Sequence, residues 1–119
     1  MGLFSKSKKT GTDLKLDKVR ILFSTGRRRE AIAYLYLIYT RLSQDKFGVG
    51  KKYSQTIRDY AIVMVKEMKQ NPQKIYPFIQ KVERAVYGGI PTTDKVFNDV
   101  VDSFKVLYTD LTGKSMPSF

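Results

Sequence analysis

The clearest hydrophobic pattern along the chain lies between Thr56 and Gln70, where apolar side chains recur at helical spacing. Residues at i, i+3, i+4, i+7, i+8 and i+11 form one stripe: Ile57, Tyr60, Ala61, Met64, Val65 and Met68. This spacing predicts an amphipathic helix. Thr56 with Asp59 three residues later predicts a capping box, in which the hydroxyl and the acid satisfy free backbone N–H groups of the first turn.

A second regular stripe predicts the last helix, which Thr93 and Asp94 open and Gly113 ends. Its apolar positions are Phe97, Val100, Val101, Phe104, Leu107, Tyr108 and Leu111. Both stripes include aromatic residues at core spacing, so we interpret most aromatic side chains as core whose hydroxyl groups reach the surface. The aromatic residues in this interpretation are Tyr34, Tyr36, Tyr39, Tyr60, Phe97, Phe104 and Tyr108.

The segment from Glu30 to Gln44 is apolar on nearly every side, with an uninterrupted apolar run at positions 31–39. Periodicity alone does not separate a buried helix from a buried strand here. The length of the segment and its two alanines favour a helix. Its apolar character all round predicts a central position among several packed neighbours.

The fourth segment carries Phe78, Ile79, Val82 and Val86 at helical spacing and runs into glycines 88 and 89. A glycine in the left-handed conformation commonly ends a helix, so the helix is expected to stop there. Proline is unfavourable inside a helix. We therefore expect the helix to begin near Pro77, with Asn71 and Pro72 in a separate short turn.

Residues 13–24 fit two patterns. Val19, Ile21 and Phe23 alternate as in a strand, whereas Leu14, Ile21 and Leu22 can share one helix face. A helix is favoured, because a single short strand has no evident partner in this chain and positions 24–26 form a turn-like sequence.

Together these segments predict an all-α fold, a compact bundle of about five helices with short connections whose neighbours run antiparallel. At 119 residues the chain has the length of one domain. We expect a flexible basic arm at residues 1–12, a single helical domain at 13–113 and a C-terminal tail at 114–119.

Charge is distributed unevenly along the chain, which has a formal net charge of +11. Residues 1–58 hold 14 basic and 4 acidic side chains, whereas residues 59–119 hold 8 basic and 7 acidic ones. Clustered charge of one sign raises the local potential and favours an anionic partner. Solubility alone also explains a basic composition, and the sequence does not decide between the two.

The chain contains neither cysteine nor histidine, which removes disulfides, thiol nucleophiles, imidazole bases and the usual zinc ligands. Its carboxylates are predicted on polar helix faces rather than in a sheltered cleft, and Asp99 and Asp102 are expected to pair with Lys95 and Lys105. The carboxylates that could act as general acids or bases are Asp59, Glu67, Glu83, Asp99 and Asp102. We therefore predict no enzymatic activity, metal, cofactor or small-molecule substrate.

No apolar run approaches the ~20 residues that span a bilayer, since the longest covers only positions 31–39. The basic start of the chain has only Leu3 and Phe4 as large apolar residues, too few for a secretory signal. These observations predict a soluble, cytoplasmic protein.

Several short motifs in order resemble a known module. They are an aromatic-rich helix after a glycine turn, Gly48, the run Thr56-Ile57-Arg58-Asp59-Tyr60-Ala61, the run Val82-Glu83-Arg84-Ala85-Val86-Tyr87-Gly88, and Thr93-Asp94. Residues 14–112 thereby resemble the C-terminal cytosolic domain of transglutaminase-like membrane proteins, a domain of uncharacterised function. Members often have Pro after the capping Thr and Glu at the third position, where this chain has Ile57 and Asp59.

The resemblance implies a free-standing accessory domain, because the larger members add membrane spans and a Cys-His-Asp enzymatic core that this chain lacks. Genes of the family often lie beside those of an AAA-type ATPase and of proteins with von Willebrand-like domains. An assembly partner is therefore expected, in an ATPase-linked or membrane-associated complex.

Basic clusters supply the candidate contacts with a partner or polyanion. Three consecutive arginines at a predicted helix start oppose the helix dipole, which invites a functional account in which they hold phosphates or carboxylates, although an exposed solvated turn explains them as well. A basic loop follows at positions 48–52, and Tyr53 lies in the same predicted connection as a protein-contact candidate. The candidate residues are Lys6, Lys8, Lys9, Arg27, Arg28, Arg29, Lys51, Lys52 and Tyr53.

Two functions follow from these features. The leading hypothesis is a non-catalytic helical module that binds a protein partner through its basic first half and turn-region tyrosines. The alternative is a sequence-independent nucleic-acid binder that uses the basic arm and the cluster from Arg27 to Arg29. A weaker third hypothesis is attachment to an anionic membrane surface through Leu3, Phe4 and the neighbouring lysines.

Overall fold

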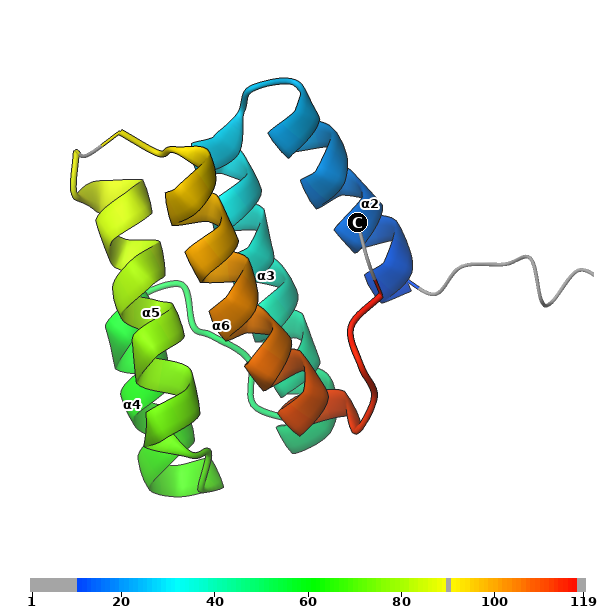
Figure 1. The fold of residues 1–119 in the computed structure, drawn as a ribbon. Coiled ribbons are helices and arrows are strands. Elements are labelled where there is room, and N and C mark those ends of the chain that lie inside the picture. The colour runs from blue at the N-terminus through cyan, green and yellow to red at the C-terminus, as the bar shows by residue number, and fades with distance from the viewer. Residues whose placement is uncertain (1–10, 90, 118–119) are drawn as a thin grey trace, which may run out of the picture.

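The structure is a computed structural model that describes residues 11–89 and 91–117 (Figure 1). These residues form the helices α2 (Gly11–Ser24), α3 (Arg28–Phe47), α4 (Ile57–Met68), α5 (Pro72–Tyr87) and α6 (Asp94–Thr112). The described part of the chain contains no strand, and the predicted all-α bundle of about five helices is confirmed. Most of the predicted basic arm, residues 1–10, and the last two residues of the predicted tail lie outside the described residues.

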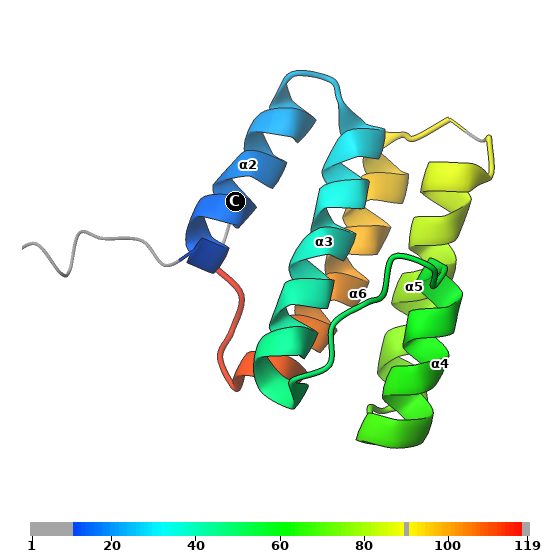
Figure 2. The ribbon, with the colours of Figure 1, turned by 180° about the vertical axis from the view of Figure 1, so that it is seen from behind.

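Helix α3 is the centre of the bundle and packs against α2, α5 and α6, as Figures 1 and 2 show. Helix α4 packs on α5, away from α2. The buried positions of α3 include Ile32, Leu35, Ile38 and Tyr39, which point to different neighbours around the helix. Its predicted central position is therefore confirmed.

The connections are short except for residues 48–56, which link α3 to α4. This segment turns back along α3, so that α4 runs in the same direction as α3 (Figure 2). The other consecutive helices run antiparallel. The expectation that all neighbours in the chain run antiparallel is thus wrong for this pair, because nine residues are enough to return the chain toward the start of α3.

A chain of aromatic rings crosses the core from α3 through α5 to α6. Centroids of successive rings lie 5.7 to 6.1 Å apart, from Tyr36 to Tyr39, Phe78, Phe104 and Tyr108. Separations of this size are favourable for aromatic pairs and contribute about 0.5–1.5 kcal/mol each beyond burial. The prediction that these residues form the core is confirmed, but the hydroxyl groups of Tyr36 and Tyr39 are buried instead of reaching the surface.

Residues 13–24 are helical, as favoured, and the strand alternative is excluded. The face of α2 that packs inward consists of Leu16, Val19 and Leu22, whereas Ile21 is exposed. The expected shared face of Ile21 and Leu22 is therefore wrong. Helix α2 begins at Gly11, inside the segment that was predicted to be a flexible arm.

Helix α5 begins at Pro72 and continues through Pro77, so the predicted start near Pro77 is wrong. Asn71 is the N-cap, and its side-chain oxygen accepts a hydrogen bond from the Gln73 N–H at 2.9 Å. An interior proline costs ~3 kcal/mol. Here Ile75 and Phe78, on either side of Pro77, are fully buried, and their burial offsets that cost while the proline ring faces solvent.

The ends of α4 and α5 show which capping predictions hold. The capping box is present, with Asp59 N–H donating to Thr56 Oγ1 at 3.0 Å and Thr56 N–H to Asp59 Oδ2 at 3.1 Å. Beyond α5 the left-handed glycine is Gly89, with φ of 71°, whereas Gly88 keeps a right-handed helical conformation. A side chain at Gly88 would meet the carbonyl oxygen of Arg84 at 2.5 Å, so this glycine is needed for space.

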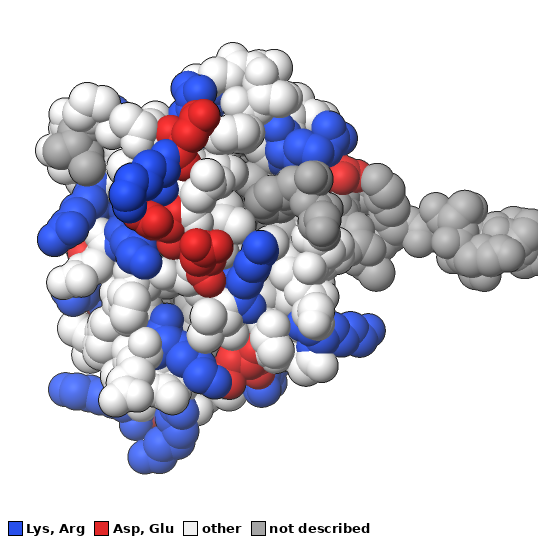
Figure 3. Space-filling model, in the orientation of Figure 1, with Lys and Arg blue, Asp and Glu red and all other residues white. Residues whose placement is uncertain are grey.

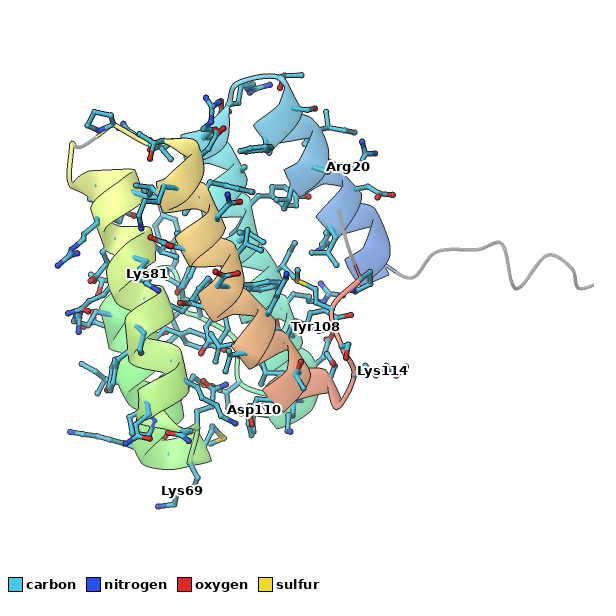
Figure 4. The ribbon with its side chains drawn as sticks, viewed as in Figure 1. Arg20, Lys69, Lys81, Tyr108, Asp110 and Lys114 are labelled. Atoms are coloured by element: carbon cyan, nitrogen blue, oxygen red, sulfur yellow. The ribbon has the colours of Figure 1, made fainter. Side chains whose placement is uncertain are left out.

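Polar contacts also tie α5 to α6 along the face in Figure 4, where Lys81 and Asp110 are labelled. Lys81 Nζ donates to Ser103 Oγ at 2.8 Å, and Lys74 Nζ pairs with Asp110 at 2.9 Å. These contacts fix the register between the two helices and hold the aromatic chain between them.

Candidate functional site

The arginine cluster at the start of α3 does not form one shared site. Arg27 forms a bidentate pair with the Glu30 carboxylate, in which Nε donates to Oε1 at 2.7 Å and Nη2 donates to Oε2 at 2.6 Å. This hydrogen bonding lowers the pKa of Glu30. Arg28 pairs with Asp94 at 2.6 Å, and its guanidinium lies 5.5 Å from the centroid of the Phe23 ring. Two of the three cations thus have structural roles, and Arg29 is exposed, as the prediction required.

Arg28 joins three helices, since it belongs to α3, pairs with the first residue of α6 and covers an aromatic ring of α2. We expect Arg28→Ala to lower the free energy of unfolding by about 1 kcal/mol, through loss of the ion pair and the cation–π contact. Chemical denaturation measures this change. Arg27→Ala is the matched control with a smaller effect, because its ion pair is exposed and stays within α3; equal losses for both variants would contradict the assignment.

The predicted residues Lys51, Lys52 and Tyr53 lie together on the wall of a groove of about 560 Å³. The groove is lined by residues of α3, the 48–56 segment, the start of α4 and the C-terminal part of α5, and Figure 2 shows how these elements are arranged. A volume of this size falls within the range of protein ligand pockets. We refer to this feature as the α3–α5 groove.

Apolar side chains make up most of the α3–α5 groove. Its inner part includes Tyr36, Ile57 and Val82, which are buried and belong to three different helices. Three of the large apolar side chains that are exposed within residues 11–89 and 91–117 also line it: Leu37 at 56%, Tyr53 at 104% and Tyr87 at 73%. Their convergence from α3, the loop and α5 makes one apolar surface from residues that are far apart in sequence.

The 48–56 segment is fixed in place by three polar contacts. The Tyr60 hydroxyl donates to the Val49 carbonyl oxygen at 2.7 Å, and burial raises the pKa of that hydroxyl. The backbone N–H of Lys52 donates to Gln55 Oε1 at 2.7 Å, and the Thr56 cap holds the far end. The basic loop predicted at positions 48–52 is therefore held by these contacts as a wall of the groove.

Positive charge at the groove is not neutralised by the residues around it. The described part of the chain forms six ion pairs that involve arginines or lysines, and none involves Lys51 or Lys52. Lys51 Nζ instead donates to the Lys52 carbonyl oxygen at 3.2 Å. Glu83, which lines an adjoining hollow together with Lys51, is held by Arg58 through contacts of 2.7 and 3.3 Å.

Tyr36 places an unusual hydroxyl beside this groove. Its side chain lines the α3–α5 groove and the residue is only 5% exposed, yet its hydroxyl oxygen has no hydrogen-bond partner among the described residues. Burial raises the pKa of Tyr36 well above its ordinary value. A buried hydroxyl without a partner costs about 1–3 kcal/mol, which a hydrogen bond with a ligand would recover. Thr92 Oγ1 is a second such group among the described residues, but Thr92 does not line this groove.

Three of the carboxylates that were candidates for catalysis make structural contacts instead. Asp59 closes the capping box, Glu83 pairs with Arg58, and Asp99 pairs with Lys95 at 3.0 Å, the last as predicted. Within residues 11–89 and 91–117 there is no group of three or more side chains arranged to hold a metal ion.

Acidic and basic side chains alternate on the face over α5 and α6 that Figure 3 shows. Acidic groups occupy its middle, so on this face the net positive charge is not gathered into one patch. The candidate lysines 6, 8 and 9 lie outside the described residues. Of the predicted contact residues, only Lys51, Lys52 and Tyr53 meet at one place.

The groove residues Tyr36, Leu37 and Tyr87 were not among the predicted contacts. Tyr36 and Leu37 belong to a continuous apolar run, in which no sequence signal separates the exposed member from the buried ones. Tyr87 directly precedes the two glycines that end α5, and an aromatic residue at such a helix end was the available signal.

Among the helices that the structure describes, none combines the length and the apolar character needed to cross a membrane. No family model, curated protein or solved structure matches the chain. The resemblance to the C-terminal domain of transglutaminase-like membrane proteins stays a prediction.

Proposed function

We propose that the protein is a non-catalytic interaction module that binds a protein partner in the α3–α5 groove. The observation that carries the proposal is the convergence of exposed Leu37, Tyr53 and Tyr87 on one apolar hollow. Contiguous apolar surface is costly to leave in water and marks sites of association in folded proteins. Tyrosines are favoured anchors in such sites, because they bury a large area and keep a polar tip.

Three exposed apolar residues in helices provide a sharp test. Leu37, Ile21 and Val106 are 56%, 49% and 48% exposed, but only Leu37 lines the groove. Immobilised protein is incubated with cell extract at high salt, and the retained proteins of the wild type are compared with those of Leu37→Asp, Ile21→Asp and Val106→Asp. We expect one partner to be retained by the wild type and both control variants and lost, by at least about tenfold, with Leu37→Asp.

Retention of the same partner by Leu37→Asp, or loss with Val106→Asp, would contradict the groove as the binding site. Circular dichroism confirms that each variant keeps its helical content, since all three positions are exposed. A partner that dissociates at modest salt from every variant alike would point to charge rather than apolar contact.

The nucleic-acid alternative receives less support than the protein-binding proposal. Arg27 and Arg28, two residues of its basic cluster, are engaged by Glu30 and Asp94. A cytoplasmic location, a link to an ATPase and contact with a membrane surface stay predictions from the sequence.

A further inference from the structure

We infer that the α3–α5 groove takes an acidic amphipathic segment of a protein partner, with large apolar side chains in the groove and carboxylates at Lys51 and Lys52. The inference rests on the proposed function and adds the chemistry of the ligand. Three features of the groove carry it: the charge of its rim, the apolar character of its interior and the unpartnered hydroxyl of Tyr36.

The lysines at the rim of the groove determine that the ligand carries negative charge. Lys51 and Lys52 lie on the same wall as exposed Tyr53, and neither forms an ion pair within the described residues. The acids nearest to this wall are already used, Glu83 by Arg58 and Asp59 by the capping box. A ligand with carboxylates therefore meets two cations that form no ion pair within the described residues, which favours acidic partners over basic ones.

The apolar interior of the groove determines that the ligand has large apolar side chains on one face. Side chains from α3, α4 and α5 supply its inner surface, with Tyr36, Ile57 and Val82 among them. Grooves of this kind between helices accept the apolar face of an amphipathic segment, whose charged residues then lie at the rim. A segment with two or three large apolar side chains flanked by Glu or Asp matches this arrangement.

Tyr36 adds a directional contact. The hydroxyl is a hydrogen-bond donor, and a backbone carbonyl or carboxylate of the ligand supplies the acceptor that the described residues do not. Because the Tyr36 hydroxyl is buried, this contact requires that side chains of the groove shift on binding. Tyr87 lines the same groove and is 73% exposed, so packing constrains its ring little.

Other occupants fit less well. Residues 1–10 carry Lys6, Lys8 and Lys9, which have the same sign as the rim. A second copy of the chain brings a net charge of +11 to a basic rim. Nucleic acid needs several cations along a phosphate backbone, whereas this groove offers two beside an apolar interior.

The inference is tested with three synthetic peptides and the whole chain. The first peptide is an amphipathic helix with Leu and Phe on one face and Glu on its flanks; the second has Lys in place of every Glu; the third is polyglutamate. Backbone amide NMR shifts locate the binding site and titration gives the affinity. We expect only the first peptide to bind, with shifts at residues 33–40, 51–57 and 82–87.

Two variants separate the contributions of the lysine charges and of the Tyr36 hydrogen bond to peptide binding. Lys51→Glu combined with Lys52→Glu should weaken binding of the first peptide by roughly tenfold, because two attractions become repulsions. Tyr36→Phe should weaken it about three- to tenfold through the lost hydrogen bond. The same Tyr36→Phe change should leave the thermal midpoint of the free protein equal or higher, since it removes an unpartnered hydroxyl; a merely structural tyrosine would lower that midpoint.

Equal binding of polyglutamate, binding of the Lys peptide, or affinity unchanged by the double lysine variant would overturn the inference. DNA, RNA and anionic vesicles serve as competitors: displacement of the first peptide by any of them at ~0.15 M salt would assign the groove to that ligand instead. If Leu37→Asp abolishes partner capture while the acidic peptide fails to bind, the proposed function stands and only the ligand chemistry is wrong.

Discussion

Replacing Gln70 with Ala should lower the free energy of unfolding by about 2–3 kcal/mol, because the buried Tyr39 hydroxyl loses its acceptor and the buried Ser43 hydroxyl loses one of its contacts. Gln70 is 5% exposed and lies in the connection between α4 and α5. Its Oε1 accepts a hydrogen bond from the Tyr39 hydroxyl at 2.7 Å, and its Nε2 donates to Ser43 Oγ at 3.2 Å. The amide therefore fastens the α4–α5 connection to the centre of α3.

A double-mutant cycle with Tyr39→Phe tests this account, and urea denaturation supplies the free energies. The Phe substitution keeps the ring and removes only the hydroxyl, so the Gln70→Ala loss should be smaller in the Tyr39→Phe background. Gln73→Ala is the matched control, because Gln73 is exposed and only its backbone N–H contacts Asn71. A cost of Gln70→Ala that is unchanged by Tyr39→Phe would contradict the network.

The sequence predicted the helices whose pattern is local. The Thr56 and Asp59 cap and the left-handed Gly113 are set by neighbours within a few residues, and both are found. Pro77 shows the limit of local rules, since the fully buried Ile75 keeps α5 helical across the proline. Which face is buried depends on the rest of the bundle and cannot be read from the segment alone.

The candidate site was predicted only in part, because its residues come from segments that are far apart in the sequence. Lys51, Lys52 and Tyr53 are consecutive, so composition alone was enough to single them out. The groove itself needs Leu37 from α3 and Tyr87 from α5, which are fifty residues apart and meet only because the 48–56 segment turns back along α3. No pattern in one sequence reveals that meeting.

The arginine cluster shows that a local electrostatic observation can have a structural explanation that lies elsewhere in the chain. Three cations at the start of α3 oppose the helix dipole, which suggested a binding role. In the structure Arg28 reaches Asp94 at the start of α6, so the cation of one helix neutralises the acid of another. The sequence of one helix does not predict a contact with a residue 66 positions away.

Alkaline unfolding should be steep, because three tyrosines are held protonated inside the bundle. Burial is the main cause that raises the pKa of Tyr36, Tyr39 and Tyr60 above the ordinary value of 10.0. Below about pH 10 both folded and unfolded chains keep these protons, and the stability is fully present. Above that pH the unfolded chain releases them first, so the free energy of unfolding falls by up to about 1.4 kcal/mol per pH unit for each group, and by up to roughly 4 for all three. Tyr60 contributes over the narrowest pH range, because its pKa is raised less than those of Tyr36 and Tyr39.

Helical circular dichroism and tyrosinate absorbance, followed together from about pH 8 to about pH 12, measure this effect. We expect the helical signal to be lost together with the part of the absorbance change that comes from Tyr36, Tyr39 and Tyr60, since ionisation of these three hydroxyl groups requires that the bundle open. Tyr36→Phe removes one titrating group without breaking a hydrogen bond among the described residues, so the slope should fall by about one third. Full ionisation of Tyr36, Tyr39 and Tyr60 while the helical signal persists would contradict this account. It would show that their hydroxyl groups reach solvent in the folded protein.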